Sequence, residues 1–541
     1  LQNLRPLSRL PISTGHTGDI RPMLPTTPSD GRPRAVLIGT VETVGLLSDQ
    51  LALLPDSPEP VAFVLVDEPD RVVGFDTLES LPRLTATLNP NLAIVSLPIS
   101  ESTLILKVRA TLASLGLPER FVPPLPELLS RPPAPTGTRT LSSRTMNWAD
   151  LIGRTPHGVD RASIAGILEG KRVLITGAGG SIGSEIARIV ATFKPAQVIL
   201  MERAENALFE VDRQIAERFP GVSRKAILHD VTNTDATLRH LAALRPHVVF
   251  HAAAHKHVPL MEDHPAHAVS NNFFGTKSIA DASLATGVER FVLISSDKAV
   301  NPSSVMGATK RLAETYTQAL HRQARTVSPS ATRFSMVRFG NVLGSACSVL
   351  PIWASQIEAG SPITVTDDRM TRYFMTITEA AMLVIQAASL PTDGASAPVY
   401  VLDMGEPVRI LDLARRFAAA LGYTPRVKGE AATPGITDQF AEIILTGARP
   451  GEKLHEELAY SAEQLNHTQH PGIRSWTSDA SLRVNMPQLV SDLAAVREST
   501  DRDQVLVAIR RHVPEMVAST SELKPFTSTQ TKPNQRPSVA A

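Results

Sequence analysis

The stretch Val173-Leu-Ile-Thr-Gly-Ala-Gly-Gly-Ser-Ile-Gly183 runs from an apolar segment directly into a glycine-rich turn. This order predicts a buried strand, a tight turn and the start of a helix. Gly177 permits the turn, Gly180 lets the backbone approach a pyrophosphate, and Gly183 lets the helix pack closely on the strand. Apolar residues at helical spacing then give the helix a buried face: Ile186, Ile189, Val190 and Phe193. The stretch therefore predicts a dinucleotide-binding turn in a parallel α/β sheet.

Two acidic residues at predicted strand ends are placed to contact the adenosine half of such a dinucleotide. Glu202 is the last residue of the next predicted strand. Its separation from the glycine turn is near the roughly 20 residues at which a carboxylate contacts the ribose hydroxyls in such folds. This favours NAD, although the adjacent Arg203 could instead pair with the 2′-phosphate of NADP. Asp230 ends the third strand and is expected at the adenine edge. Further cofactor contacts are expected at Ser181, Ile182, Val231 and Ala252.

Short apolar runs alternate with helical stretches along most of the chain. Beyond Lys171 these runs predict strands at residues 172–176, 197–201, 225–228, 247–251 and 290–295. Before it, strands are predicted at 34–38, 61–66 and 92–97, with a helix over 101–115. Parallel strands joined by helical crossovers follow from this order. The sequence thus predicts two Rossmann-like, doubly wound α/β domains, the second carrying a smaller C-terminal substrate lobe from about Pro351 onward.

Shifts in composition give the domain boundaries. The predicted order is a flexible Pro-rich lead (1–32), an N-terminal domain (33–130), a linker (131–170), a cofactor-binding domain with its lobe (171–518) and a disordered tail (519–541). In the first domain, Gly39 and Gly45 do not complete a phosphate fingerprint. We therefore favour helix-start and packing roles for them over a second nucleotide site.

The overall composition excludes several classes of protein. Hydrophobic residues make up 43% of the 541 residues, as in a folded globular protein. Lys plus Arg number 54 and Asp plus Glu 53, so no net field would attract nucleic acid. No segment of the sequence has the roughly 20 consecutive apolar residues that a membrane span requires, and the N-terminal stretch lacks the apolar core of a signal peptide. A cytoplasmic protein is expected, with peripheral attachment to the inner face of the membrane left open, as is an anchor upstream of Leu1.

The single cysteine, Cys347, is expected to be a buried structural thiol.

A second cluster of polar residues follows a later strand. Ser295-Ser296-Asp297-Lys298 stands where that strand meets its loop, at the edge where open α/β sheets bind ligands. Met306-Gly-Ala-Thr-Lys310 follows on a predicted helix, and its spacing of four puts both ends on one face. Here the sequence resembles the extended short-chain dehydrogenase/reductases, with Met306 at the position of their usual Tyr.

The Met and the run Ser296-Asp-Lys-Ala-Val-Asn-Pro302 narrow the resemblance to the CapD-like polysaccharide biosynthesis family, in its long form. Within that family the chain is most similar to the UDP-N-acetylglucosamine 4,6-dehydratases that use a Ser-Met-Lys set. His255 and Cys347 depart from the family's common Tyr and Gly. The other matching blocks cover 150–154, 251–262, 272–276, 338–345, 371–376 and 449–453.

The resemblance implies a redox-neutral dehydration. Hydride leaves sugar carbon 4 for NAD(P)⁺, water is eliminated across carbons 5 and 6, and the hydride returns to carbon 6. It further implies that Lys298 is the base and Asp297 the acid of the elimination, that Ser296 binds the 4-hydroxyl, and that Lys310 holds the nicotinamide ribose. Met306 has no ionisable atom, so another group, such as Asp297 or an ordered water, must accept the 4-hydroxyl proton, and the sequence does not decide which.

Substrate contacts are expected from several basic and polar residues. Arg449 and Lys453 are candidates for the diphosphate, since Arg suits bidentate phosphate binding. Residues expected to line the rest of the site are Lys256, His257, Asn272, Arg338, Asn341 and Arg372. The family also implies a homo-oligomer acting on a UDP-sugar. A metal site is not expected, although His251, His255, His257, His264 and His267 are close in sequence, because no acidic or Cys partner completes a known spacing.

Two other functions stay open. A nucleotide-sugar epimerase, or a dehydratase that inverts carbon 5, would use the same scaffold, and Asp297-Lys298 favours elimination over 4-epimerisation. A catalytically silent dinucleotide-binding regulator would explain the missing Tyr, but it would not need Ser296, Asp297, Lys298 and Lys310 together.

Overall fold

The computed structural model describes residues 33–52, 58–66, 76–97, 102–122, 151–328, 331–392, 396–430, 440–460, 465–476 and 484–516. The chain divides into two compact units, the second beginning at Arg139. The predicted lead (1–32), the Pro-rich start of the linker (131–144) and the predicted tail (519–541) lie outside the described residues.

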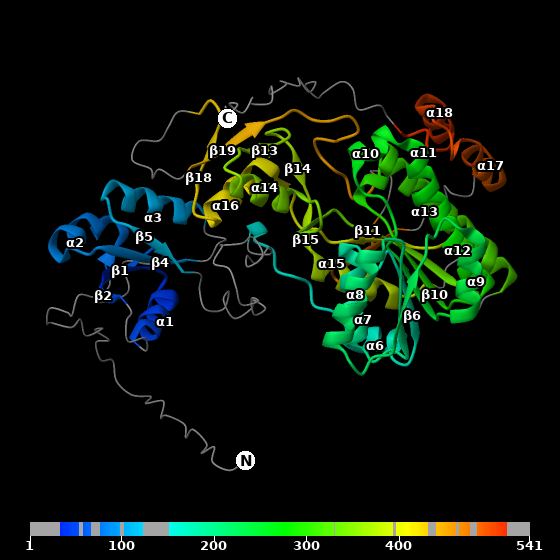
Figure 1. Cartoon of the computed structure of the whole chain (residues 1–541), viewed down its shortest axis with the longest axis horizontal. Coiled ribbons are helices and arrows are strands. Elements are labelled where there is room, and N and C mark those ends of the chain that lie inside the picture. Colours follow the sequence, from blue (N-terminus) through cyan, green and yellow to red (C-terminus); the bar gives the residue numbers. More distant parts are fainter. Residues whose placement is uncertain are drawn as a thin grey trace, which may run out of the picture. The chain divides into compact units, whose positions relative to one another are not determined.

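The first unit is a parallel five-stranded sheet in the order β3-β2-β1-β4-β5, drawn in blue in Figure 1. The predicted α/β domain is therefore present. Gly39 packs against Thr43 and Ser96, as predicted, but Gly45 is exposed with open space around it, so its predicted packing role is wrong. The elements are β1 (Arg34–Gly39), α1 (Val41–Ala52), β2 (Glu59–Leu65), β3 (Asp76–Thr77), η1 (Leu78–Ser80), α2 (Leu81–Leu88), β4 (Leu92–Ser96), α3 (Ser102–Ser114) and β5 (Glu119–Phe121).

The second unit is built on a nine-stranded sheet in the order β20-β21-β16-β11-β10-β9-β6-β7-β8. The seven strands from β16 to β8 are parallel, as predicted, whereas β20 and β21 add an antiparallel edge. The strand order reverses beside β6, so its carboxyl end and that of β9 form the crevice where such sheets bind ligands. The strands are β6 (Arg172–Thr176), β7 (Gln197–Glu202), β8 (Arg224–Leu228), β9 (Val248–His251), β10 (Arg290–Ile294), β11 (Arg333–Arg338), β16 (Val399–Leu402), β20 (Asn466–His467) and β21 (Ile473–Trp476).

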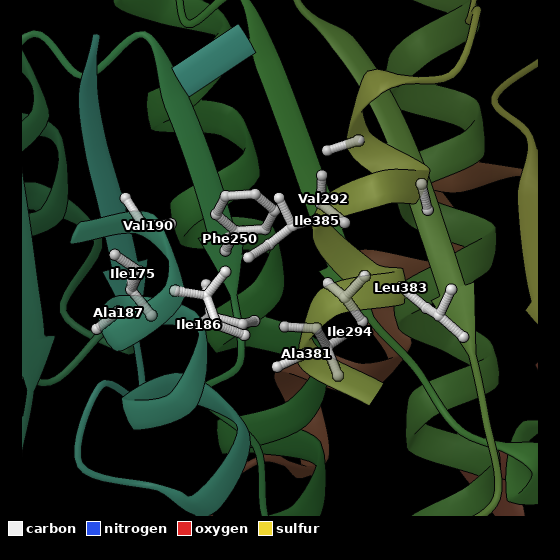
Figure 2. Packing of buried hydrophobic residues seen from close by; sticks show 14 of the residues in the cluster. Ile175, Ile186, Ala187, Val190, Phe250, Val292, Ile294, Ala381, Leu383 and Ile385 are labelled. Atoms are coloured by element: carbon white, nitrogen blue, oxygen red, sulfur yellow. The ribbon is translucent and has the colours of Figure 1, made fainter. Parts of the chain in front are cut away.

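Helices cover both faces of this sheet. One face carries α6 (Arg161–Leu168), α7 (Ser181–Ala191), α8 (Glu205–Arg218) and α15 (Ile377–Ser389); the other carries α9 (Thr234–Leu244), α12 (Gly275–Ala285) and α13 (Val305–Val327) (Figure 1). Figure 2 shows side chains of β6, β9 and β10 packed against α7 and α15. Ile175, Ile186 and Phe250 in this layer are fully buried. The apolar residues that recur at helical spacing after the glycine turn are therefore part of the core, and this core holds the turn in place.

A smaller group of helices packs at one end of α13. It contains α10 (Val258–Asp263), α11 (Pro265–Ala268), the π-helix η4 (Val269–Phe274), α17 (Met486–Val496) and α18 (Arg502–His512). Their apolar side chains form a separate buried cluster with the first turns of α13. The C-terminal helices thus support the helix that carries Met306 and Lys310.

The predicted C-terminal lobe is only partly correct. A three-stranded sheet of β13 (Ile363–Val365), β19 (Phe440–Leu445) and β18 (Thr424–Val427) does form, with α14 (Val349–Glu358) and α16 (Ile410–Ala420) beside it. However, β16 and β21 are strands of the main sheet and α15 covers one of its faces. β16 and most of α15 are buried there, and β21 buries its two end residues, Ile473 and Trp476. Two small ladders complete the region: β12 (Asn341–Leu343) with β15 (Phe374–Thr376), and β14 (Thr371–Arg372) with β17 (Val408–Arg409).

The linker predicted over 131–170 is too long. Helix α6 buries Ile164, Ile167 and Leu168 in the core of the second unit. Arg154 pairs with the buried carboxylate of Glu379 at 2.8 Å. Residues from 151 therefore belong to the second unit. Among the described residues, no helix is long and apolar enough to cross a membrane.

Candidate active site

The glycine turn between β6 and α7 has the conformation that the sequence predicts. Gly177 has a φ of +64°, and a Cβ there would lie 2.7 Å from Ala253 N, so β6 and the segment after β9 approach too closely for a side chain. Gly180 is the N-cap of α7. The first amides of the helix thus face the crevice, where they suit a phosphate.

A pocket opens beside this turn and brings together most of the predicted cofactor residues. Those that line it are Gly177, Gly180, Glu202, Arg203, Asp230, Val231 and Ala252, and His229, His255 and Asn271 join them. Ser181 and Ile182 do not line the pocket: the Ser181 Oγ accepts a hydrogen bond from Ala346 N–H at 3.0 Å, and Ile182 packs against the core. Gly183 is buried inside α7.

The acidic end of the pocket is held in place by backbone amides. Glu202 accepts hydrogen bonds from the N–H groups of Gly179, Arg203 and Ala204. Burial would raise the pKa of Asp230, but the hydrogen bonds from Thr232 and the charge of Arg203 hold it below its usual value. The Arg203 guanidinium donates to Asn271 Oδ1 and lies 3.2 Å from His255 Nε2. These residues fit the adenosine half of a nicotinamide dinucleotide.

The predicted catalytic loop follows β10. Ser296 is the N-cap of a short 3₁₀ turn, η5 (Asp297–Ala299). The Ser296 hydroxyl donates to Asp297 Oδ1 at 2.8 Å, and its oxygen accepts from Lys298 N–H at 3.3 Å. Asp297 is fully buried, and its Oδ2 has no hydrogen-bond partner within the described part of the chain. An unsatisfied buried carboxylate oxygen is costly, so it is suited to meeting a ligand hydroxyl.

The Lys298 ammonium has three oxygen neighbours. It donates to Asp297 Oδ1 at 3.0 Å and to Asn341 Oδ1 at 3.2 Å, and it lies 3.5 Å from Glu456 Oε1. Burial by itself would lower the pKa of Lys298, but Asp297 and Glu456 hold it above its usual value despite the opposing charge of Arg372. A base at this position must therefore lose a proton before it acts.

Helix α13 packs directly on this loop. A Cβ on Gly307 would overlap the Lys298 carbonyl oxygen, so the glycine in Met-Gly-Ala-Thr-Lys lets the helix approach. Lys310 donates to the Ile294 carbonyl at 2.6 Å, and burial lowers its pKa to about 8 against the opposing charge of Glu314. Met306 is 3% exposed and lies in the apolar cluster with the C-terminal helices, where it acts as a packing residue.

Three of the residues predicted to bind substrate have partners within the protein, and two of them are fully buried. Arg338 is fully buried and pairs with both oxygens of Glu314 at 2.8 Å. Asn272 is also fully buried and holds the backbone of His255 on both sides. Lys453, 13% exposed, donates to the Val300 carbonyl. Arg338 and Asn272 are fully buried and hold other parts of the site, so these two predictions need correction. Lys453 also anchors a loop, and its contact with a diphosphate stays a prediction.

The remaining predicted residues lie nearer the surface or beside Lys298. Arg449 is 56% exposed and pairs with Glu452. Arg372 lies 3.9 Å from Glu456 and donates to the Leu454 carbonyl. Lys256 donates to the Ala346 carbonyl, and His257 is the N-cap of α10. Within the described residues, no group of His, Cys, Asp and Glu side chains is arranged to hold a metal ion.

The prediction that Cys347 is a buried thiol is wrong, because Cys347 is exposed. Its φ is +55°, in the left-handed region that favours glycine, which accounts for the Gly common at this position in the resembled family. The backbone before it joins two parts of the site, since Ala346 contacts both Ser181 and Lys256.

Sequence comparison assigns the family. Residues 173–477 match the polysaccharide biosynthesis protein family. The chain belongs to this family. The probable polysaccharide biosynthesis protein EpsC of Bacillus subtilis is 42% identical over 438 residues, covering 79% of this chain and 68% of that protein. This match extends well beyond the cofactor fold, so the membership confirms the predicted resemblance.

Relatives with named reactions are less similar. A UDP-N-acetylglucosamine 4,6-dehydratase (inverting) of Campylobacter jejuni is 31% identical over 294 residues, 54% of this chain and 78% of that enzyme. A UDP-glucose 4-epimerase of Rickettsia massiliae is 30% identical over 297 residues, 54% and 79% of the two chains. The crystal structure of Pen from Bacillus thuringiensis, 31% identical, superposes with a TM-score of 0.50 over 58% of this chain and 91% of Pen. Identity alone does not separate the two named reactions.

Proposed function

We propose that this protein is an NAD-dependent nucleotide-sugar 4,6-dehydratase, a hydro-lyase that acts on a UDP-N-acetylhexosamine, with UDP-N-acetylglucosamine as the first candidate. The observation that carries the proposal is the hydrogen-bonded chain from Ser296 through Asp297 to Lys298. It joins a hydroxyl, a carboxyl and an amine, the three groups that an oxidation followed by an elimination needs.

The residues around the glycine turn fit NAD better than NADP. A bound NAD⁺ would accept the hydride from sugar carbon 4 and return it to carbon 6. Glu202 presents a carboxylate oriented by three amides, which would accept from ribose hydroxyls and repel a 2′-phosphate. The Arg203 guanidinium already has Asn271 and His255 as neighbours, and these contacts would compete with its pairing to a 2′-phosphate.

The same chain of hydrogen bonds provides a route by which the 4-hydroxyl can lose its proton without a Tyr. Ser296 already donates to Asp297, so a 4-hydroxyl bound to Ser296 Oγ can pass its proton through Ser296 to the carboxylate. Asp297 would then hold the proton that the departing 6-hydroxyl requires. One proton leaves oxygen 4 and one reaches oxygen 6, so the two steps balance.

Lys298 is the base at carbon 5 in this proposal. Oxidation at carbon 4 acidifies the proton on carbon 5, and the amine next to Asp297 would remove it as the 6-hydroxyl leaves. A 4-epimerase needs no base at carbon 5, whereas a dehydratase that inverts carbon 5 would need a second proton donor there. The pairing of Lys298 with Asp297 favours elimination over simple epimerisation.

The test is to incubate the purified protein with NAD⁺ and UDP-N-acetylglucosamine and to follow the loss of one water by mass spectrometry. The wild type should give the water-loss product, and Lys298→Ala should give none. Proton NMR of the product would report the configuration at carbon 5. Conversion to a 4-epimer of unchanged mass would instead support the epimerase, and no turnover of any nucleotide sugar despite NAD binding would support the regulator.

A further inference from the structure

Glu456 is a buried carboxylate at the catalytic loop that the sequence patterns did not single out. Its side chain is 3% exposed, with Oε1 3.5 Å from the Lys298 ammonium and 3.9 Å from Arg372 Nε. Its other oxygen, Oε2, is buried and accepts no hydrogen bond from any described group. A buried carboxylate oxygen that accepts no hydrogen bond is costly.

The partners of Lys298 limit where its proton can go. An ammonium has three N–H donors, and the described neighbours are two carboxylates, Asp297 and Glu456, and the amide of Asn341. An amide oxygen is not a practical proton acceptor at neutral pH. Arg372, the other charged group that faces this site, carries no acceptor either. Among the described neighbours of Lys298, only the two carboxylates can take its proton directly.

One of these carboxylates is already in use. In the proposed dehydration, Asp297 receives the proton of the 4-hydroxyl through Ser296 and keeps it for the 6-hydroxyl. It cannot hold the proton of Lys298 during the same step. Glu456 is the carboxylate that is left.

We propose that Glu456 accepts a proton from Lys298 and so converts the ammonium into the amine that removes the proton from sugar carbon 5. This inference rests on the proposed function. Lys298 loses a proton to Glu456, and the ammonium and carboxylate become an amine and a carboxylic acid with no change in net charge. The amine takes the carbon 5 proton as the bond between carbon 6 and oxygen breaks and Asp297 protonates the departing hydroxyl. When carbon 6 is reduced, Lys298 returns the proton to carbon 5, and Glu456 returns its proton to Lys298.

The segment that carries Glu456 is anchored on the catalytic loop at several points, which fixes the carboxylate relative to Lys298. Lys453 donates to the Val300 carbonyl at 2.9 Å and Tyr460 to the Ala299 carbonyl at 3.1 Å. Ser303 donates to the Gly451 carbonyl at 3.0 Å. A transfer between groups 3.5 Å apart therefore needs only a small side-chain movement.

The deciding variant is Glu456→Gln, which keeps the shape and an acceptor oxygen but cannot take a proton. Glu457→Gln is the matched control, since Glu457 is the neighbouring residue, is about half exposed, and has Asn301 and Lys453 as partners. Two steps are measured for each protein with UDP-N-acetylglucosamine. The first is single-turnover oxidation, followed by the absorbance of the reduced nicotinamide. The second is elimination, followed by water loss and by deuterium entry at carbon 5 in D₂O.

For Glu456→Gln we expect oxidation within about threefold of wild type and elimination slower by about 100-fold or more at pH 7. The wild-type elimination rate should vary little with pH near neutrality, because the proton moves within the pair. In the variant Lys298 must lose its proton to solvent, so the rate should rise about tenfold per pH unit. Glu457→Gln should match wild type in both steps.

Two outcomes would overturn this role. One is elimination by Glu456→Gln at the wild-type rate or faster, with an unchanged pH profile. The other is an equal loss of oxidation and elimination, which would mean that Glu456 only maintains the structure. A wild-type protein that oxidises the sugar but never eliminates water would instead reject the dehydratase proposal itself.

Discussion

The Ser296 hydroxyl lies 2.8 Å from Asp297 Oδ1 and donates to it, while the Ser296 oxygen accepts from the Lys298 amide. One serine therefore fixes both the acid and the base of the proposed elimination. In the proposed reaction this relation would take the place of a Tyr phenol. Met306 cannot supply that group, because it is buried among apolar side chains and carries no ionisable atom.

Replacing Ser296 should stop the reaction at its first step. In Ser296→Ala the 4-hydroxyl loses its route to Asp297, so kcat for both oxidation and water loss should fall by about 100-fold or more, with little change in NAD affinity. Stopped-flow absorbance and mass spectrometry would measure the two steps. Ser361→Ala, at an exposed position between α14 and β13, should behave as wild type. A Ser296→Ala enzyme that oxidises the sugar at the normal rate would contradict the relay.

A methyl group at Gly307 should displace the catalytic loop. Because a Cβ there would overlap the Lys298 carbonyl, Gly307→Ala should both lower the free energy of unfolding and reduce kcat. Gly166→Ala is the control, since Gly166 lies in α6 with open space around it and should gain about 0.5–1 kcal/mol of stability. Urea unfolding and turnover assays would compare the two. Equal behaviour of the two variants would refute the close contact between α13 and the loop.

The buried pair of Arg338 and Glu314 should matter for folding more than for substrate affinity. Both side chains are fully buried, so Glu314→Gln leaves the Arg338 charge without its carboxylate and should cost about 3–5 kcal/mol of unfolding free energy. The exposed pair of Arg213 and Glu217 is the comparison, and Glu217→Gln should cost less than about 1 kcal/mol. Denaturant titration would measure both. A similar cost for the two variants would show that the buried pair is not strongly coupled.

Lys310 should make the stability depend on pH. Burial lowers its pKa to about 8, below the 10.5 of a free lysine, so the unfolded chain binds more protons between these values. Stability should therefore rise with pH from about 8 to about 10.5, by up to about 3 kcal/mol from this residue. Lys310→Met should have a flatter profile over that window in urea titrations. A wild-type stability that falls through this range as steeply as that of Lys310→Met would argue against a depressed pKa.

The sequence predicted the strands and the cofactor turn well because those signals are local. Runs such as 172–176 and the helical spacing after Gly183 determine burial from neighbouring residues alone. Glu202, Asp230 and Ala252 could be placed for the same reason, since they lie at or just after the carboxyl ends of the parallel strands β7, β8 and β9.

The roles of Arg338, Asn272 and Lys453 could not be predicted in this way. A basic or amide side chain near a predicted site indicates a ligand contact, but its partner within the protein lies elsewhere in the chain: Glu314 for Arg338, and Val300 for Lys453. Glu456 was missed for a related reason. Glu456 lies three residues after Lys453, just beyond the 449–453 motif. Its neighbours in the sequence do not indicate that it faces Lys298.

The anchoring of the catalytic loop also has a consequence for biosynthesis. Lys453 and the Val300 carbonyl that it holds are 153 positions apart, and the ribosome makes the cofactor fold first. A nascent chain that ends before the 449–460 segment would contain Ser296, Asp297 and Lys298 but not Glu456. We expect such a chain to bind the dinucleotide without eliminating water, so the complete chemistry would appear only after most of the protein has been synthesised.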